Sequence, residues 1–191
     1  MPSPALRAAI AADIPALEAL IARSAMRLGT GFYTPAQTAA LTREVFGVDS
    51  QLVVDGTYFV MEEHGAAIAC GGWSRRSTTF GGDKMKSVPD RLLDPATEAA
   101  KIRAFFVDPA MARRGYGSAL MQHCTAAAAA AGFTQLELVA TMPGVPLYLA
   151  HGFAVVERFE LALAQGAVAA PMALMRRAIE VAAMPQALAA R

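Results

Sequence analysis

Residues 105–120 read FFVDPAMARRGYGSAL, and this stretch decides how the rest of the chain is interpreted. It begins with aromatic and β-branched residues, a pattern typical of a buried strand. Pro109 ends that strand because it has no N–H to give to a neighbouring strand. Two arginines, two glycines and a long helical pattern follow. The order strand, basic glycine turn, helix leaves free N–H groups at a helix N-terminus, which favours an anion site.

The charges and glycines of the turn fit a phosphate ligand. Arg113 and Arg114 can each add charge-assisted hydrogen bonds worth about 1.5–3 kcal/mol. Gly115 and Gly117 let phosphate oxygens approach the backbone without meeting a Cβ atom. The chain contains no G-x-x-x-x-G-K-[ST] sequence, so a Walker loop is disfavoured. A basic surface turn with helix-capping glycines remains the alternative interpretation.

The stretch resembles the acetyl-CoA signature of the GNAT superfamily of N-acetyltransferases, in which V-x-P precedes Q/R-x-x-G-x-G/A at a helix start. Val107-Asp108-Pro109 and Gly115-Tyr116-Gly117 match it, while Ala112 stands at the Q/R position. The resemblance implies acetyl-CoA as cofactor, with CoA as product, and backbone donors at a strand bulge near Phe106 and Val107. The residues expected to bind it are Phe106, Val107, Arg113, Arg114, Gly115, Tyr116, Gly117, Ser118, Ala119 and Thr141.

A second stretch, residues 147–153, resembles the family pattern Y-x-x-x-G-F. The resemblance implies that the Tyr148 hydroxyl lies near the cofactor sulfur and acts as general acid; the alternative is a tyrosine packed in a short helix. Several family members use a glutamate on the strand before the turn as base, but Lys101 stands there. Glu98 is the substitute candidate, with a solvated loop carboxylate or a water chain as alternatives.

The acceptor side is expected to include Phe32, Tyr33 and Trp73, although a tryptophan at a strand end is also typical of a core. The long polar connection 75–97 is expected to be a functional loop because it has no periodicity. Gly71 and Gly72, inside a strand pattern, predict a bulge or a close ligand.

The resemblance implies an α/β fold with the order βααβββαβαββ. It predicts a central twisted mixed sheet of about six to seven strands, with helices on both faces. The strand before the basic turn and the strand after its helix would be parallel neighbours that splay apart around the cofactor. We expect one domain over residues 1–177 and a C-terminal tail over 178–191. The expected strands cover residues 6–10, 57–62, 66–73, 101–107, 136–140, 153–163 and 172–176.

Composition excludes several other classes of protein. The 191 residues carry a net charge of +1, which gives no reason to expect nucleic acid or a membrane as partner. Two cysteines and the lack of a secretory signal indicate a reducing compartment, so a cytoplasmic protein is expected. The histidines and cysteines show no metal spacing, so no metal is expected. The hydrophobic, alanine-rich composition is compatible with a homodimer.

The predicted function is acetyl transfer from acetyl-CoA to a primary amine by direct attack, with a small-molecule acceptor expected rather than a protein. The missing base leaves a CoA-binding sensor or regulatory module without turnover as one alternative. A protein N-terminal or lysine acetyltransferase is the other, and it would need an open peptide groove.

Overall fold

The structure, a computed structural model, describes residues 4–85 and 90–180. The bounds of its helices and strands follow chain order. They are β1 Ala5–Ala8, α1 Ile14–Leu28, α2 Pro35–Glu44, α3 Ser50–Val54, β2 Tyr58–Glu63, β3 Ala66–Ser74, β4 Ala100–Val107, α4 Tyr116–Ala130, β5 Gln135–Thr141, α5 Val145–Ala150, β6 Ala154–Leu163 and β7 Val168–Ala178. Short 3₁₀ turns join several of them.

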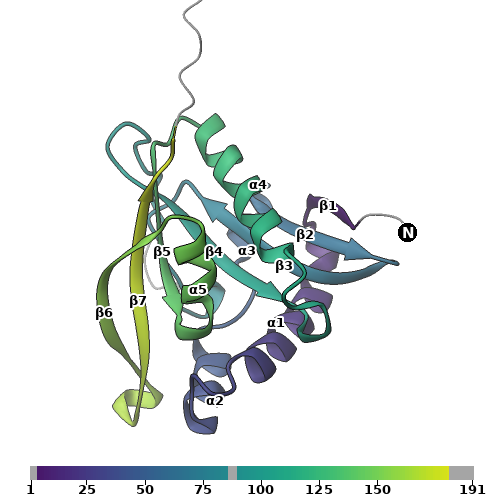
Figure 1. Cartoon of the computed structure of the whole chain (residues 1–191), viewed down its shortest axis with the longest axis vertical. Helices are drawn as coiled ribbons and strands as arrows, with labels where there is room; N and C mark the ends of the chain where they lie inside the picture. Colours follow the sequence, from purple (N-terminus) through teal and green to yellow (C-terminus); the bar gives the residue numbers. More distant parts are fainter. Residues whose placement is uncertain (1–3, 86–89, 181–191) are drawn as a thin grey trace, which may run out of the picture.

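The strands form one seven-stranded sheet in the order β1-β2-β3-β4-β5-β7-β6 (Figure 1). Every neighbouring pair is antiparallel except β4 and β5, which are parallel because α4 connects them. The α/β mixed sheet predicted from the sequence is therefore confirmed.

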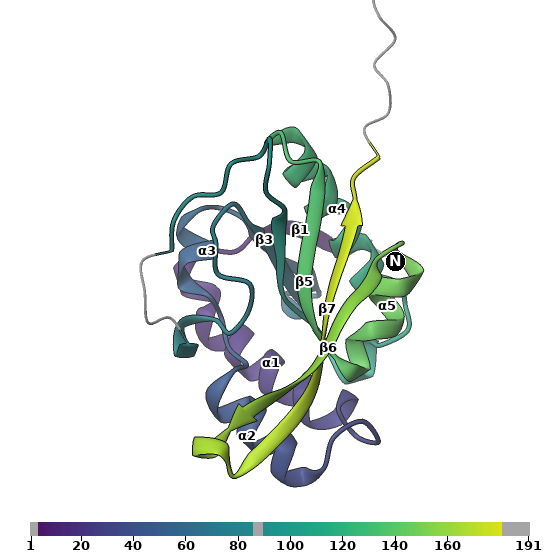
Figure 2. The same cartoon turned by 90° about the vertical axis from the view of Figure 1, so that its left-hand side faces the viewer.

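Helices cover both faces of the sheet, as predicted. On one face, Leu120 and Cys124 of α4 are buried in a cluster that includes Trp73 and Leu138 of the sheet. On the other face, α1 and α3 pack against β2 and β3 in a second cluster. Figure 2 shows the sheet between these two layers, with the far ends of β6 and β7 extending beside α2. No helix of the described ranges is long and apolar enough to cross a bilayer.

Strands β4 and β5 separate almost as soon as they meet. The only residue pairs between them are Ala100 with Leu136 and Lys101 with Glu137. At the last pair, the buried Lys101 Nζ lies 2.6 Å from Glu137 Oε1. Beyond it, the second half of β4 has no partner strand on its β5 side within the described sheet. The predicted splaying of these two parallel strands is confirmed, and it opens a gap at the centre of the sheet.

Two elements differ from those expected from the sequence. Residues 52–55, for which no element was expected, lie in and just after the short helix α3, which Asp49 caps by accepting a hydrogen bond from Gln51 N. Strand β7 begins at Val168 rather than at residue 172, with Pro171 inside it. Pro171 is tolerated because β5 pairs with β7 only from Met172 onward. The tail expected from residue 178 lies outside the described residues from 181 on.

Candidate active site

A β-bulge bends β4 at the mouth of the gap. Cys70 pairs with Phe106 and Gly72 pairs with Arg103, so Gly71 alone faces two residues of β4, Ala104 and Phe105. Ala104 has φ of 54°, a left-handed conformation unusual for alanine. A Cβ atom at Gly71 would lie 2.6 Å from Phe105 Cδ2, so only glycine leaves room for that ring. The bulge had been expected at Phe106 and Val107; it lies at Ala104–Phe105, because Gly71 rather than the end of β4 sets the register.

A buried tyrosine from β2 holds this bulge. Tyr58 is fully buried, and its hydroxyl donates a hydrogen bond of 3.1 Å to the carbonyl oxygen of Ala104. The same hydroxyl lies 3.3 Å from Cys70 Sγ. Burial raises the pKa of Tyr58 well above its usual value, so the donor proton is retained at neutral pH. Tyr58 thus supports the strained Ala104 backbone from beneath the sheet.

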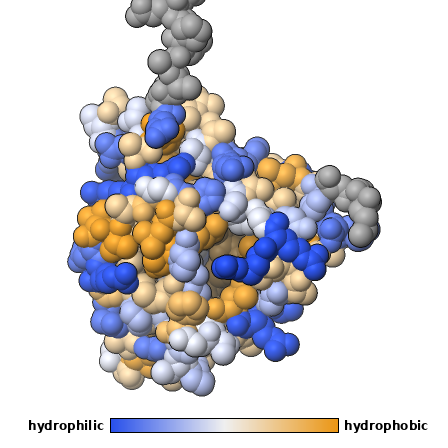
Figure 3. Space-filling model, viewed as in Figure 1, coloured by the Kyte–Doolittle hydropathy of each residue, from blue (hydrophilic) through white to orange (hydrophobic). Residues whose placement is uncertain are grey.

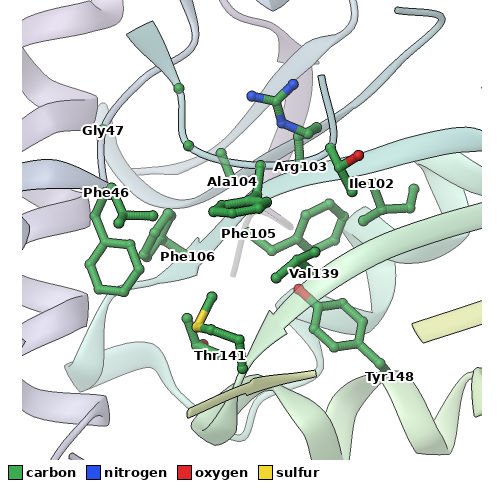
Figure 4. Close-up of a pocket in the computed structure, with 16 residues that line it drawn as sticks. Phe46, Gly47, Ile102, Arg103, Ala104, Phe105, Phe106, Val139, Thr141 and Tyr148 are labelled. Atoms are coloured by element: carbon green, nitrogen blue, oxygen red, sulfur yellow. The ribbon is translucent and has the colours of Figure 1, made fainter. Parts of the chain in front are cut away.

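Two adjoining pockets occupy the gap between β4 and β5. The acceptor-side pocket, as we name it, is bounded by residues 79–82, the region of Phe46 and the bulge of β4. The cofactor-side pocket is bounded by the end of α1, residues 143–147 and Val107. They share five residues, which lie along the line where they meet. These are Phe46, Phe105, Phe106, Thr141 and Tyr148 (Figure 4).

The basic turn leads from β4 into α4 beside the cofactor-side pocket. Arg113 and Gly115 both have positive φ, 65° and 87°, which turns the chain tightly before α4 begins at Tyr116. The first hydrogen bond of α4 runs from Ala119 N to the carbonyl oxygen of Gly115. The backbone N–H groups before residue 119 therefore have no acceptor within the helix and point outward. Arg113 and Arg114 are exposed, and neither side chain bonds to another residue in the described ranges.

Gly117 is a close-packed position in this turn. A Cβ atom there would lie 3.2 Å from Leu147 Cδ2 of α5 and 3.9 Å from a methyl of Val107. The glycine therefore lets the start of α4 approach both β4 and α5. A phosphate group fits at this point, because the two arginines are exposed and the N–H groups at the start of α4 point outward. Figure 3 shows a hollow in this face of the molecule, with hydrophilic side chains along one rim and apolar surface along the other.

Tyr148 stands between the two pockets. It is 9% exposed and its ring makes edge contacts with Phe105 and Phe153, at centroid distances of 6.5 and 5.9 Å. Its hydroxyl points into the acceptor-side pocket (Figure 4) and makes no hydrogen bond to another residue in the described parts of the chain. Burial raises the pKa of the Tyr148 phenol above its ordinary value. The Tyr148 hydroxyl therefore keeps its proton and donates it to no other described residue.

The structure places the candidate base Glu98 away from both pockets. Its carboxylate accepts from Arg91 Nη1 at 2.8 Å and from the backbone of Asp94 at 2.9 Å. The Arg91 guanidinium lowers the pKa of Glu98 to about 2, which makes it a poor proton acceptor. Lys101, where the family pattern has an acid, is committed to Glu137. Within residues 4–85 and 90–180, no Asp, Glu or His lines either pocket.

The three aromatic residues expected on the acceptor side lie in different places. Tyr33 lines the cofactor-side pocket, and its hydroxyl donates to the carbonyl of Pro171 at 2.8 Å and accepts from Met142 N at 2.9 Å. Phe32 is 49% exposed and lines neither pocket. Trp73 packs edge-on against Phe133 in the core beneath α4 and also lines neither pocket.

Other aromatic residues take that place. Phe46 follows α2 and Phe80 belongs to the long connection after β3, and both line the acceptor-side pocket. The sequence signal for Phe80 was weak: an aromatic residue before Gly81 and Gly82 in an otherwise polar loop. Arg103 was also missed, because its side chain crosses from β4 to the carbonyl of Thr78 in that loop.

Comparison with known proteins identifies the family. The model of the acetyltransferase (GNAT) domain matches residues 54–155, more than half of the chain. The chain therefore belongs to the GNAT acetyltransferase family, which confirms the expected enzyme class, an acetyl-CoA-dependent N-acetyltransferase. No curated protein matches the sequence.

Solved structures share the fold at low sequence identity. A GCN5-related N-acetyltransferase from Rhodopseudomonas palustris has a TM-score of 0.69 at 17% identity, covering 93% of this chain and 97% of its own. The putative acetyltransferase yncA from Salmonella typhimurium, solved with acetyl-CoA, scores 0.61 at 16% identity, with coverages of 98% and 100%. A phosphinothricin acetyltransferase from Sinorhizobium meliloti, also solved with acetyl-CoA, scores 0.60 at 22% identity, with coverages of 93% and 89%.

Proposed function

We propose that the protein transfers an acetyl group from acetyl-CoA to a primary amine, by direct attack of the amine, in the gap between β4 and β5. The observation that carries the proposal is the position of Tyr148, whose free hydroxyl faces the line where the two pockets meet. A donor reaching the gap from the basic turn and an acceptor entering from the other side would meet beside that hydroxyl.

The cofactor side is assigned to residues whose geometry suits a pyrophosphate and its attached arm. Arg113, Arg114 and the outward amides of residues 115–118 would bind the phosphates. The backbone of β4 at Val107 has no partner strand toward β5, so its polar groups on that side are available to the arm and to the acetyl carbonyl oxygen. Thr141, at the end of β5, lines both pockets and completes the opposite wall.

Bound acetyl-CoA would supply the acetyl group as an activated thioester. Tyr148 holds the proton that the departing sulfur needs, and general acids of this kind contribute about 10²–10⁴ in rate. Burial separates the phenol and thiol pKa values further than the usual 10 and 8.5, so we place the contribution of Tyr148 near the lower limit. The acceptor must arrive with a neutral amino group, since no carboxylate lines the described pockets to accept its proton. As the N–C bond forms and the C–S bond breaks, the nitrogen loses one proton, which passes through solvent and restores the proton that Tyr148 gives to the sulfur.

The absence of an acidic residue from the described lining also favours a second candidate. A protein that binds CoA without turnover, as a sensor or regulatory module, would need the basic turn but no base. Both candidates predict cofactor binding, and only the enzyme consumes acetyl-CoA when an acceptor is present.

The test is a panel of amine acceptors, with free-thiol release from acetyl-CoA as the readout. We expect at least one small amine to release thiol above the rate of spontaneous hydrolysis, with an acetylated product of matching mass. Tight CoA binding with no acetylated product across small amines and amine-bearing peptides would support the sensor instead.

A further inference from the structure

The acceptor-side pocket has an unusual concentration of aromatic rings. They come from four separate parts of the chain: the segment after α2, the connection after β3, strand β4 and helix α5. The five residues are Phe46, Phe80, Phe105, Phe106 and Tyr148. Figure 4 shows the rings of Phe46, Phe105 and Phe106 on the β4 side, with the Tyr148 ring opposite. Aromatic walls of this kind favour a flat apolar ligand through offset or edge-on contacts.

The same pocket offers no free charge to a ligand. Arg103 is the one cation of the described lining, and it is 3% exposed. Its Nη2 lies 2.8 Å from Asp49 Oδ2, and its Nη1 donates to the carbonyl of Thr78 at 2.8 Å. The guanidinium is therefore already compensated. A ligand carboxylate would have to displace Asp49, and a second ammonium group on a ligand would find no carboxylate among the lining residues.

The pocket is also small. Its volume is about 80 Å³, below the roughly 150 Å³ of an apolar cavity that takes up benzene. Because the pocket is open to solvent, one ring can enter with part of its edge outside, and little of the pocket is then left for a second ring. The small size of the pocket, its aromatic walls and the compensated charge of Arg103 therefore all favour a ligand with one uncharged ring.

We infer that the acceptor is a small monoamine carrying one aromatic ring and no carboxylate, which binds with its amino group unprotonated. The inference rests on the proposed function and specifies its acceptor. Rings can attract a cation by about 0.5–2 kcal/mol, but a buried ammonium without a carboxylate loses more hydration than that. The neutral amine is the form that these walls accept and the form that can attack.

The first experiment compares acceptors of similar length by kcat/KM. Benzylamine is the aromatic monoamine. 1,5-Diaminopentane has a second ammonium group and no ring, and phenylalanine has the ring and a carboxylate beside its amino group. We expect benzylamine to exceed both by at least ~10-fold. Its kcat/KM should rise with pH toward the pKa of the amine itself, which the ring lowers below the 10.4 of a lysine side chain, since no described lining group takes the proton.

The second experiment measures binding without turnover. Benzyl alcohol, a neutral and unreactive analogue, is titrated calorimetrically into CoA-loaded protein. Phe80→Ala should weaken its binding about 10-fold and leave CoA affinity unchanged. Phe159→Ala is the matched control, because Phe159 is also half-buried in the cluster beside α2 but lines neither pocket. It should leave benzyl alcohol binding unchanged.

The outcomes separate the inference from the proposed function. If 1,5-diaminopentane or phenylalanine is the better acceptor, the inference is wrong and the acetyltransferase proposal stands. If CoA binds but no amine is acetylated, the proposed function is wrong. In that case no acceptor is left for the inference to specify, and the calorimetry decides only whether the pocket takes a neutral ring, which it does not if benzyl alcohol fails to bind or if both alanine variants weaken its binding equally.

Discussion

The two sides of the gap between β4 and β5 are built in different ways. The part of the cofactor side that we assign to phosphate is backbone from one continuous stretch, the end of β4, the basic turn and the start of α4, although the pocket beside it is also lined by α1 and residues 143–147. The acceptor side consists of side chains from distant segments, including Phe46, Phe80 and Tyr148. A phosphate site made of amides and glycines depends on local conformation. A pocket made of rings depends on which distant segments the fold brings together, so it can change without altering the other side.

The largest effect is expected from a substitution that disrupts the cofactor side alone. Gly117→Glu places a carboxylate among the groups assigned to phosphate, so acetyl-CoA binding should fall below detection in calorimetry. Gly117→Ala is the control, because it tests only the 3.2 Å approach of a Cβ atom to Leu147. We expect the alanine variant to bind acetyl-CoA within about tenfold of wild type. Equal affinity of the glutamate variant and wild type would contradict the assignment of the turn.

The next effect concerns the junction of the two sides. Tyr148→Phe keeps the ring and its contacts with Phe105 and Phe153 and removes the hydroxyl. We expect kcat to fall about 100-fold, with little change in melting temperature or in acetyl-CoA affinity. The measurement is kcat with one acceptor under conditions where chemistry limits the rate. A folded variant within threefold of wild-type kcat would exclude Tyr148 as the acid.

A smaller effect is expected at the bulge, which both sides share. Tyr58→Phe leaves the Ala104 carbonyl without its donor, at a cost of about 1–3 kcal/mol in the free energy of unfolding. Because the bulge aims the β4 backbone into the gap, we also expect kcat to fall about tenfold at a temperature where the variant is fully folded. A variant that loses stability but keeps full kcat would show that Tyr58 serves the core only.

The smallest effect is expected at Glu98. Glu98→Gln should leave kcat at neutral pH unchanged, since this carboxylate pairs with Arg91 outside both pockets. Its folded-state pKa of about 2 lies below the usual 4.5 of a glutamate, so any stability it adds is present above about pH 4.5 and is lost as the pH falls toward 2. Melting curves of both proteins should therefore differ slightly at pH 7 and converge in acid. A large drop in kcat would restore Glu98 as a candidate base.

For this same reason the sequence carries clearer signals for the stretch assigned to the cofactor than for the acceptor-side pocket. Residues 105–120 contain their own strand, turn and helix signals, and the splayed strands followed from the family resemblance. The bulge could not be placed, because its register depends on the contact of Gly71 with a ring from another strand. Phe80 lay in a loop without periodicity, and Trp73 looked the same in sequence whether it faced a ligand or Phe133.

Hydrogen exchange on binding of CoA tests the central claim most directly, that one gap between β4 and β5 receives the cofactor. Amides 115–118 precede the first closing helical bond, so we expect them to exchange freely in the protein alone. Addition of CoA should slow exchange in peptides covering 115–118 and 104–107, and leave β1 and β6 unchanged. Protection confined to any other part of the chain, with these two segments unaffected, would contradict the account.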